Sequence, residues 1–167
     1  MDIISHGLWG TLAFGRKTRR RFFIAFLFGI EPDLLSFGIF FVSMAFGFSD
    51  RHDFSAEPPH ADAIPIYVHY LYNVTHSVIF FAVLFIFLWI LFRKPIMESL
   101  AWGAHILLDI PTHSYQFFPT PFLWPFSDLK VDGIPWTSPF IFIPNVVLLI
   151  VFFGWMVIVY RKKRKAL

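Results

Sequence analysis

Long apolar segments that end in basic clusters limit this chain to a membrane fold. Hydrophobic residues make up 57% of the 167 residues and charged residues only 15%, against about 25% charged in soluble domains. A helix needs about 20 apolar residues to cross a bilayer. We therefore predict an all-α fold, a polytopic membrane helical bundle with about four transmembrane helices: Phe22–Phe48, Ile66–Phe92, Ile96–Ile110 and Phe140–Tyr160.

The N-terminal segment Met1–Gly15 is apolar but too short to span. It also lacks the basic start of a signal peptide. We interpret it as a half-membrane helix that carries His6, with an ordinary amphipathic anchor as the alternative. Residues 1–167 then form a single membrane-embedded domain.

Twelve of the 14 lysines and arginines lie in three clusters, Arg16–Arg21, Arg93–Lys94 and Arg161–Lys165. Basic residues beside membrane spans favour the cytoplasmic side. We therefore expect the three clusters and both termini in the cytoplasm. Clusters that adjoin apolar spans bind anionic lipid rather than nucleic acid, so we expect anionic lipid and no nucleic acid as a partner.

Two ionisable residues lie inside the third apolar segment. His105 and Asp109 are four residues apart, so a helix presents both on one face. Ionisable residues inside a membrane are costly and usually serve a function. Histidine and aspartate are common metal ligands, and the chain has no cysteine, so any metal site must use histidines and carboxylates.

Two carboxylates flank a proline in the first span, as Glu31-Pro32-Asp33. Pro32 removes one helical hydrogen bond and should kink the helix. The alternative is a span that breaks here, with both acids at an aqueous edge. On an ideal helix Glu31 and Asp33 point about 200° apart, so both reach one ion only if Pro32 distorts the turn.

Five ligand-type side chains fall within one band of membrane depth. Measured from the basic clusters at about 1.5 Å per residue, they lie roughly 15–25 Å deep in a hydrocarbon layer of about 30 Å. We predict that they bind a divalent metal, with zinc favoured and manganese or iron as alternatives. A buried polar network without chemistry is the rival interpretation. The predicted ligands are His6, Asp33, His76, His105 and Asp109.

Three other parts of the chain bear on this site. His69 and Asn73 share a helical face with His76. His52 and His60 are expected to be solvated in the loop Ser49–Pro65. Pro111–Pro139, rich in proline and aromatic residues, is expected to form a lid at the outer surface.

Several short motifs, taken in order, resemble the YdjM-like family of inner-membrane metal-dependent hydrolases. They are His6, Gly29-x-x-Pro32-Asp33, His76-Ser77, His105-x-x-x-Asp109 and Leu123-Trp124-Pro125-Phe126-Ser127. The family is distantly similar to zinc-dependent phospholipase C, and the resemblance implies a bacterial-type inner membrane and the five-residue metal site above. Family members often have Thr-Pro-Trp-Gly after the aspartate. Here Pro111-Thr112-His113-Ser114 follows, which makes His113 a candidate ligand or acid.

These observations predict a hydrolase that cleaves an ester or phosphoester, with a membrane lipid as substrate. Glu31 is the predicted general base and His113 the second candidate catalytic residue. An ion or proton-coupled transporter using the same side chains is one rival. A non-catalytic membrane scaffold is the other. The sequence leaves the oligomeric state open.

Overall fold

The computed structural model describes residues 1–48 and 64–165. The described residues contain helices and turns and no strand, which confirms the all-α prediction. The elements in chain order are α1 (Ile3–Gly10), the π-helical turn η1 (Thr11–Gly15), α2 (Arg19–Ala45), α3 (Ile66–Thr75), α4 (Val78–Phe92), the 3-10 turn η3 (Met97–Ser99), α5 (Leu100–Thr112) and α6 (Pro139–Lys165).

Fewer helices can cross a membrane than the four that we predicted. Among the described residues, α2 and α6 are long and apolar enough, and a third span results if α3 and α4 count as one broken helix. The predicted span Ile96–Ile110 is instead η3 followed by the 13-residue α5. At 1.5 Å per residue α5 reaches only about 20 Å, too short to cross.

The second predicted span is broken between α3 and α4, which meet at 60°. Ser77 causes the break because its backbone is extended and its hydroxyl accepts hydrogen bonds from the amides of Ile79 and Phe80. This is the geometry of a helix N-cap, which starts a new helix rather than continuing the old one. The break leaves His76 between the two helices, with its ring turned inward and fully buried.

By contrast, α2 runs without interruption from Arg19 to Ala45 with Pro32 inside it. The helix therefore does not divide into two short pieces at Pro32. The hydroxyl of Ser36 donates to the carbonyl of Pro32 at 2.9 Å, in a buried position. Asp33 lies on this continuous helix, one residue beyond the proline.

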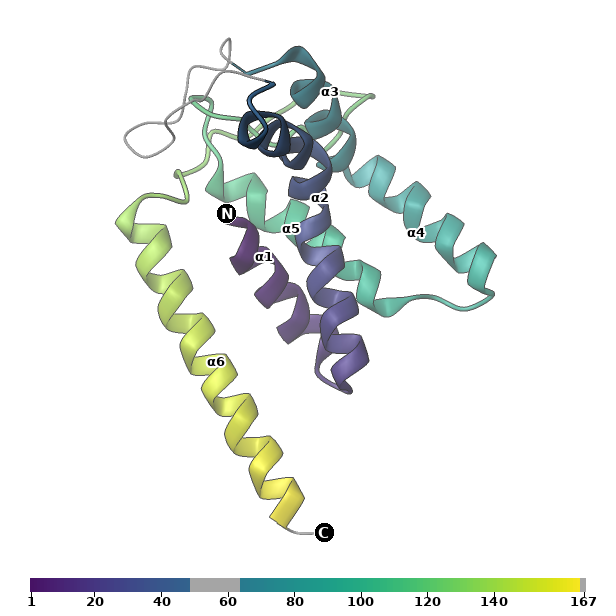
Figure 1. The fold of residues 1–167 in the computed structure, drawn as a ribbon, viewed down its shortest axis with the longest axis vertical. Coiled ribbons are helices and arrows are strands. Elements are labelled where there is room, and N and C mark those ends of the chain that lie inside the picture. The colour runs from purple at the N-terminus through teal and green to yellow at the C-terminus, as the bar shows by residue number, and fades with distance from the viewer. Residues whose placement is uncertain (49–63, 166–167) are drawn as a thin grey trace.

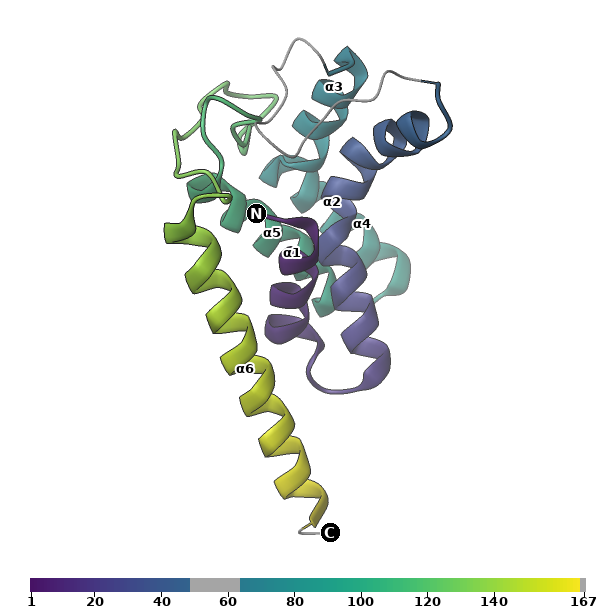
Figure 2. The same cartoon turned by 60° about the vertical axis from the view of Figure 1, so that its left-hand side comes forward.

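Small residues bring α1, α2 and α5 into close contact, side by side in Figures 1 and 2. A Cβ atom on Gly29 would lie 2.8 Å from the carbonyl oxygen of His6 and 2.9 Å from the Cα of Gly7. A Cβ on Gly10 would lie 2.7 Å from the Cβ of Ala101. The three backbones approach closely because these positions lack larger side chains, and α1 thereby holds His6 against α2 and α5.

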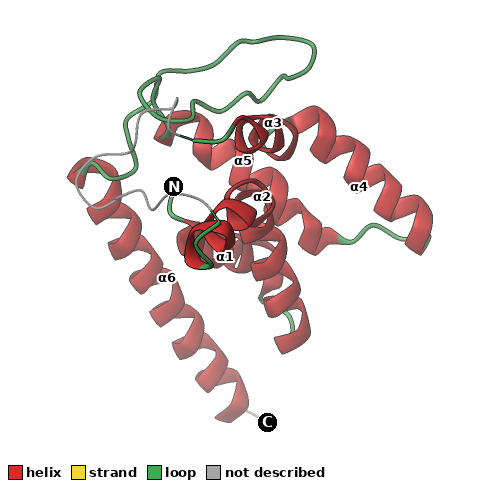
Figure 3. Cartoon of the chain, turned by 45° about the horizontal axis from the view of Figure 1, so that its top comes forward, coloured by secondary structure: helices red, strands yellow, loops and turns green. Residues whose placement is uncertain are grey.

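The segment between α5 and α6 is a loop that folds back over the end of α5 and onto α3. The amides of Gly133 and Trp136 donate to the carbonyls of His113 and Thr112, at 2.8 and 2.9 Å. Phe118 packs against Tyr72 of α3, whose hydroxyl donates to the Phe118 carbonyl at 2.9 Å. Figure 3 shows this loop beside α3 and α5, on the side of the molecule where the expected lid would lie.

The basic clusters lie away from that loop. In Figure 1 the α1–α2 turn, the α4–α5 turn and the C-terminal end of α6 all lie below the loop, which is at the top. This arrangement agrees with one cytoplasmic face for the three clusters. The N-terminal end of the chain, by contrast, lies among the helices, where the amino group of Met1 contacts Asp109.

Single-cysteine labelling tests this orientation, since the chain has no cysteine of its own. Because basic clusters are retained in the cytoplasm, Lys17→Cys, Lys94→Cys and Lys162→Cys should react with impermeant maleimide only from the cytoplasmic side. Lys130→Cys, in the exposed loop after α5, should react only from the other side. Labelling of Lys94→Cys and Lys130→Cys from the same side would contradict the orientation.

Candidate metal centre

Four ligand-type side chains from three parts of the chain meet at one point. They are Asp33 of α2, His76 at the α3–α4 break, and His105 and Asp109 on one face of α5. One ligand atom from each lies within 4.8 Å of all the others. The side chains of the two histidines and Asp109 are at most 1% exposed, whereas that of Asp33 is 19% exposed. The group is thus accessible only along Asp33 and its neighbours.

The hydrogen bonds of the two histidines determine which ring nitrogen is free. His105 Nδ1 lies 2.7 Å from the carbonyl oxygen of Gly29, which can only accept, so Nδ1 carries the hydrogen. His76 Nδ1 lies 3.0 Å from the hydroxyl of Thr75, and that hydroxyl donates to the carbonyl of Tyr72 at 3.4 Å. Both rings therefore keep a lone pair on Nε2, the arrangement expected of metal-binding histidines held by outer partners.

These two lone pairs face each other. The Nε2 atoms of His76 and His105 are 3.1 Å apart, and in neutral rings with the hydrogen on Nδ1 neither Nε2 atom can donate to the other. Asp109 Oδ2 lies 3.5 Å from the first and 3.1 Å from the second. Asp33 Oδ1 lies 3.5 and 3.7 Å from the same atoms. Four acceptors that converge in a buried space repel one another unless a cation lies among them.

The spacing of these atoms suits a tetrahedral metal ion. Zinc bonds nitrogen and oxygen at about 2.0–2.1 Å, so neighbouring ligands of a tetrahedron are about 3.3–3.4 Å apart. The five measured separations run from 3.1 to 3.7 Å. The residues present therefore fit a divalent cation.

Asp109 presents its other oxygen to a second set of groups. Oδ1 lies 2.9 Å from His6 Nε2 and 3.3 Å from His113 Nε2, and it also contacts the Met1 amino group. The contact with His6 lacks hydrogen-bond geometry, and both ring nitrogens of this buried histidine have no hydrogen-bond partner in the described chain. The His6 ring stacks on His105, with centroids 3.6 Å apart. An unpartnered buried nitrogen here is available to a cation.

The structure thus brings all five predicted ligands together and places His113 at the edge of the group, 10% exposed. It does not bring Glu31 there. Glu31 is half-buried on the continuous helix α2, and it forms no hydrogen bond or ion pair with any described residue. His69 stacks instead on Phe118, with centroids 4.7 Å apart. His52 and His60 lie outside the described residues.

Sequence reasoning missed the groups that orient the histidines. The Gly29 carbonyl carries no sequence signal, because any residue has a carbonyl and only the tertiary fold aims this one at His105. Thr75 offered a weak signal, a hydroxyl next to His76 at a helix end. The indole of Trp102 donates to the Thr75 carbonyl at 2.8 Å and fixes the same turn.

Comparison with known proteins finds no matching family model, no matching curated protein and no matching solved structure. The resemblance to the YdjM-like family therefore rests on the motifs of the sequence.

Metal analysis of the purified protein tests the centre. We expect about one tightly held divalent ion per chain, and we expect His105→Ala and Asp109→Ala to lose it because each removes a donor from a four-donor set. His69→Ala is the matched control, because this histidine of α3 lies outside the group and stacks on Phe118. Full metal retention in both ligand variants would reject the site.

The close helix crossing predicts a second effect on metal content. Gly29→Ala places a methyl group against the backbone of His6 and Gly7, so α1 must move away from α2. Overpacking of this kind costs about 1–3 kcal/mol, and we expect a lower melting temperature together with weaker metal retention. Gly38→Ala on the same helix is the control, because its Cβ would meet only Leu34 atoms at 3.9 Å. Equal melting temperatures and equal metal retention in the two variants would contradict this coupling.

Proposed function

We propose that this protein is a membrane-embedded, metal-dependent hydrolase that cleaves an ester or phosphoester bond, with zinc as its ion. The supporting observation is the pair of facing Nε2 atoms of His76 and His105, 3.1 Å apart, each with its hydrogen committed elsewhere. A purely structural polar network would place a donor opposite each acceptor. Here four acceptors converge instead, as in metal sites.

Asp33, His76, His105 and Asp109 would hold the ion, and His6 lies on the other side of Asp109. A divalent ion in this position supplies Lewis acidity toward a carbonyl or phosphoryl oxygen and lowers the pKa of water toward neutrality. The two oxygens of Asp109 face different groups. Oδ2 faces the Nε2 atoms of His76 and His105, and Oδ1 faces those of His6 and His113. The Oδ1 atom is already in contact with the amino group of Met1.

We assign proton transfer to His113. Its Nε2 atom lies 3.3 Å from Asp109 Oδ1, and its side chain is partly exposed at the end of α5. A neutral or protonated imidazole in contact with a carboxylate is a typical general acid–base group. Glu31, the general base predicted from the sequence, lies outside the donor group, so the variants below decide between the two residues.

A lipid substrate is supported by the surroundings of Asp33, the exposed member of the donor group. The next residues along α2, Leu34 and Leu35, are 46% and 43% exposed. Apolar side chains beside the accessible carboxylate favour a substrate with an acyl chain over a fully polar one. Together with the motif resemblance, this supports a phospholipid of a bacterial-type inner membrane.

Turnover of a lipid panel, measured beside metal content, tests the proposal. We expect hydrolysis by the zinc-loaded protein and loss of hydrolysis after chelation. His113→Gln should keep the metal and lose about 10²–10⁴-fold in turnover, the usual contribution of general acid–base catalysis. Asp33→Asn should weaken metal retention. Glu31→Gln is the matched variant, and we expect it to keep both metal and turnover.

Two outcomes would count against this assignment. A large loss of turnover in Glu31→Gln, with metal retained, would return the base to Glu31. If the metal-loaded protein hydrolyses no ester but moves cations across proteoliposomes, it is a transporter. The absence of ionisable side chains from α4 argues against a polar path along that helix.

A further inference from the structure

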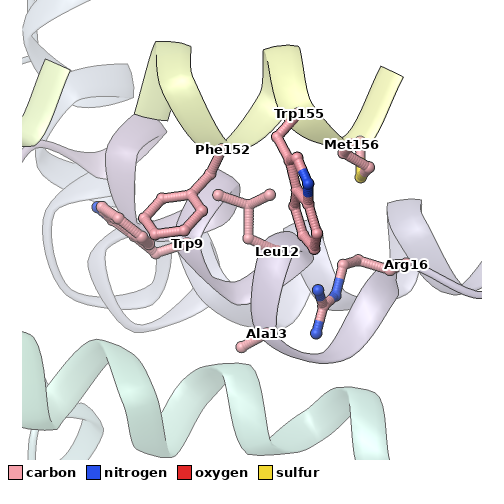
Figure 4. Close-up of a pocket in the computed structure, with 7 residues that line it drawn as sticks. All are labelled: Trp9, Leu12, Ala13, Arg16, Phe152, Trp155 and Met156. Atoms are coloured by element: carbon pink, nitrogen blue, oxygen red, sulfur yellow. The ribbon is translucent and has the colours of Figure 1, made fainter. Parts of the chain in front are cut away.

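A crevice separates α6 from the hairpin formed by α1, η1 and the start of α2. It consists of two adjoining cavities of about 240 and 600 Å³, which share Arg16 and Met156. Figure 4 shows the smaller cavity, where Trp9 and Leu12 of the hairpin face Phe152 and Trp155 of α6. The larger cavity continues toward the C-terminal end of α6. We call the two together the α6 crevice.

The two parts of the α6 crevice differ in chemistry. The smaller cavity is lined by apolar and aromatic side chains, with Arg16 as its one charged residue. The larger one adds three cations, Lys17, Arg19 and Arg161. The described residues that line either cavity include no carboxylate to balance these four positive charges. Arg21 nearby is already paired with Glu98 at 3.1 Å.

The packing of α6 shows why this crevice needs an occupant. Near its start, α6 is held to α1 by Asn145, which accepts from the Trp9 indole at 2.7 Å and donates to the Ser5 hydroxyl at 2.8 Å. Beyond Phe152, which meets Trp9 edge-on, the helix has little protein cover. Trp155 is 54% exposed and Tyr160 68% exposed. The basic end of the helix is therefore open to lipid beside the cationic hairpin.

We propose that one anionic phospholipid occupies the α6 crevice. Its phosphate lies among Arg16, Lys17, Arg19 and Arg161, and one acyl chain lies along Trp9 and Trp155. Guanidinium groups bind phosphate oxygens through paired hydrogen bonds, and basic residues at the cytoplasmic ends of spans attract anionic lipid. A cavity lined by aromatic and aliphatic groups does not hold ordered water and suits an alkyl chain.

This lipid is distinct from the substrate of the proposed hydrolase. Arg16 follows His6 by ten residues of continuous helix, which places it about 15 Å from the metal centre. The bound lipid fills the space between α6 and the hairpin, so it stabilises the position of α6 and does not react. The inference stands whether or not the protein is a hydrolase.

Native mass spectrometry of the detergent-solubilised protein tests the site. We expect phosphatidylglycerol to remain bound at one molecule per chain, at least about tenfold more than phosphatidylcholine. The double variant Arg16→Glu with Arg161→Glu should lose this preference. Its matched control is Arg93→Glu with Lys94→Glu, which reverses two charges in another basic cluster and should keep it. An unchanged melting temperature and helical circular dichroism spectrum would show that the double variant still folds.

Fluorescence tests the acyl chain and the source of the phosphate. In phosphatidylcholine nanodiscs, phosphatidylglycerol with brominated chains should quench tryptophan emission more than brominated phosphatidylcholine does. Trp155→Phe should reduce that difference. Glycerol 1-phosphate should not relieve the quenching, because the chain contributes to binding.

Several results would overturn the proposal. The first is equal retention of phosphatidylglycerol and phosphatidylcholine by the native protein. The second is an equal loss of the phosphatidylglycerol preference in the control variant, and the third is displacement of the bound lipid by glycerol 1-phosphate. If the double variant does not fold, Lys17→Gln provides a milder test, and undiminished phosphatidylglycerol retention in that variant would count against the site. Dimers that persist without bound lipid would assign the crevice to a second copy of the chain.

Discussion

The convergence of four lone pairs at the centre of the helices is the constraint on which the rest of this structure depends. Asp33 of α2, His76 at the α3–α4 break, and the pair His105 and Asp109 of α5 come from three parts of the chain that lie far apart in the sequence. Each histidine has one nitrogen held by an outer partner and the other turned inward. Such an arrangement is stable in an apolar environment only when a cation offsets the repulsion. The fold therefore supplies a geometry that fits a cation, and binding of such an ion would add to the stability of the folded chain.

The close crossing of α1 with α2 and α5 makes this geometry possible. Within lipid, apolar side chains gain little by leaving the solvent, so helices associate through close packing and hydrogen bonds. Gly29 serves both needs, because its missing side chain admits the backbone of α1 and its carbonyl accepts from His105. The same residue thus sets the position of His6 and the tautomer of His105. Helix packing and the orientation of His105 are therefore coupled through one glycine.

The sequence was informative about which residues meet and less informative about how the chain crosses the membrane. Ionisable side chains are rare in apolar segments, so His105 and Asp109 could be identified from their types and spacing alone. Hydropathy did not reveal the break at Ser77, whose capping hydroxyl divides one apolar run into α3 and α4. The predicted span Ile96–Ile110 is wrong, because α5 is too short to cross the membrane and is covered by neighbouring helices instead of lipid. Outer partners such as the Gly29 carbonyl depend on tertiary contacts and leave no trace in the sequence.

A polar chain joins α6 to α1, the helix that carries His6. Asp2 caps α1 through the Ser5 amide and accepts from the Ser5 hydroxyl at 2.6 Å. That hydroxyl in turn accepts from Asn145 of α6. Hydrogen bonds are stronger where water is excluded. These few contacts therefore orient α6 on α1 at Ser5, the residue before His6. Beyond Phe152 the helix has little protein cover, so the bilayer must cover it, and the cationic crevice beside it bears on how α6 is held.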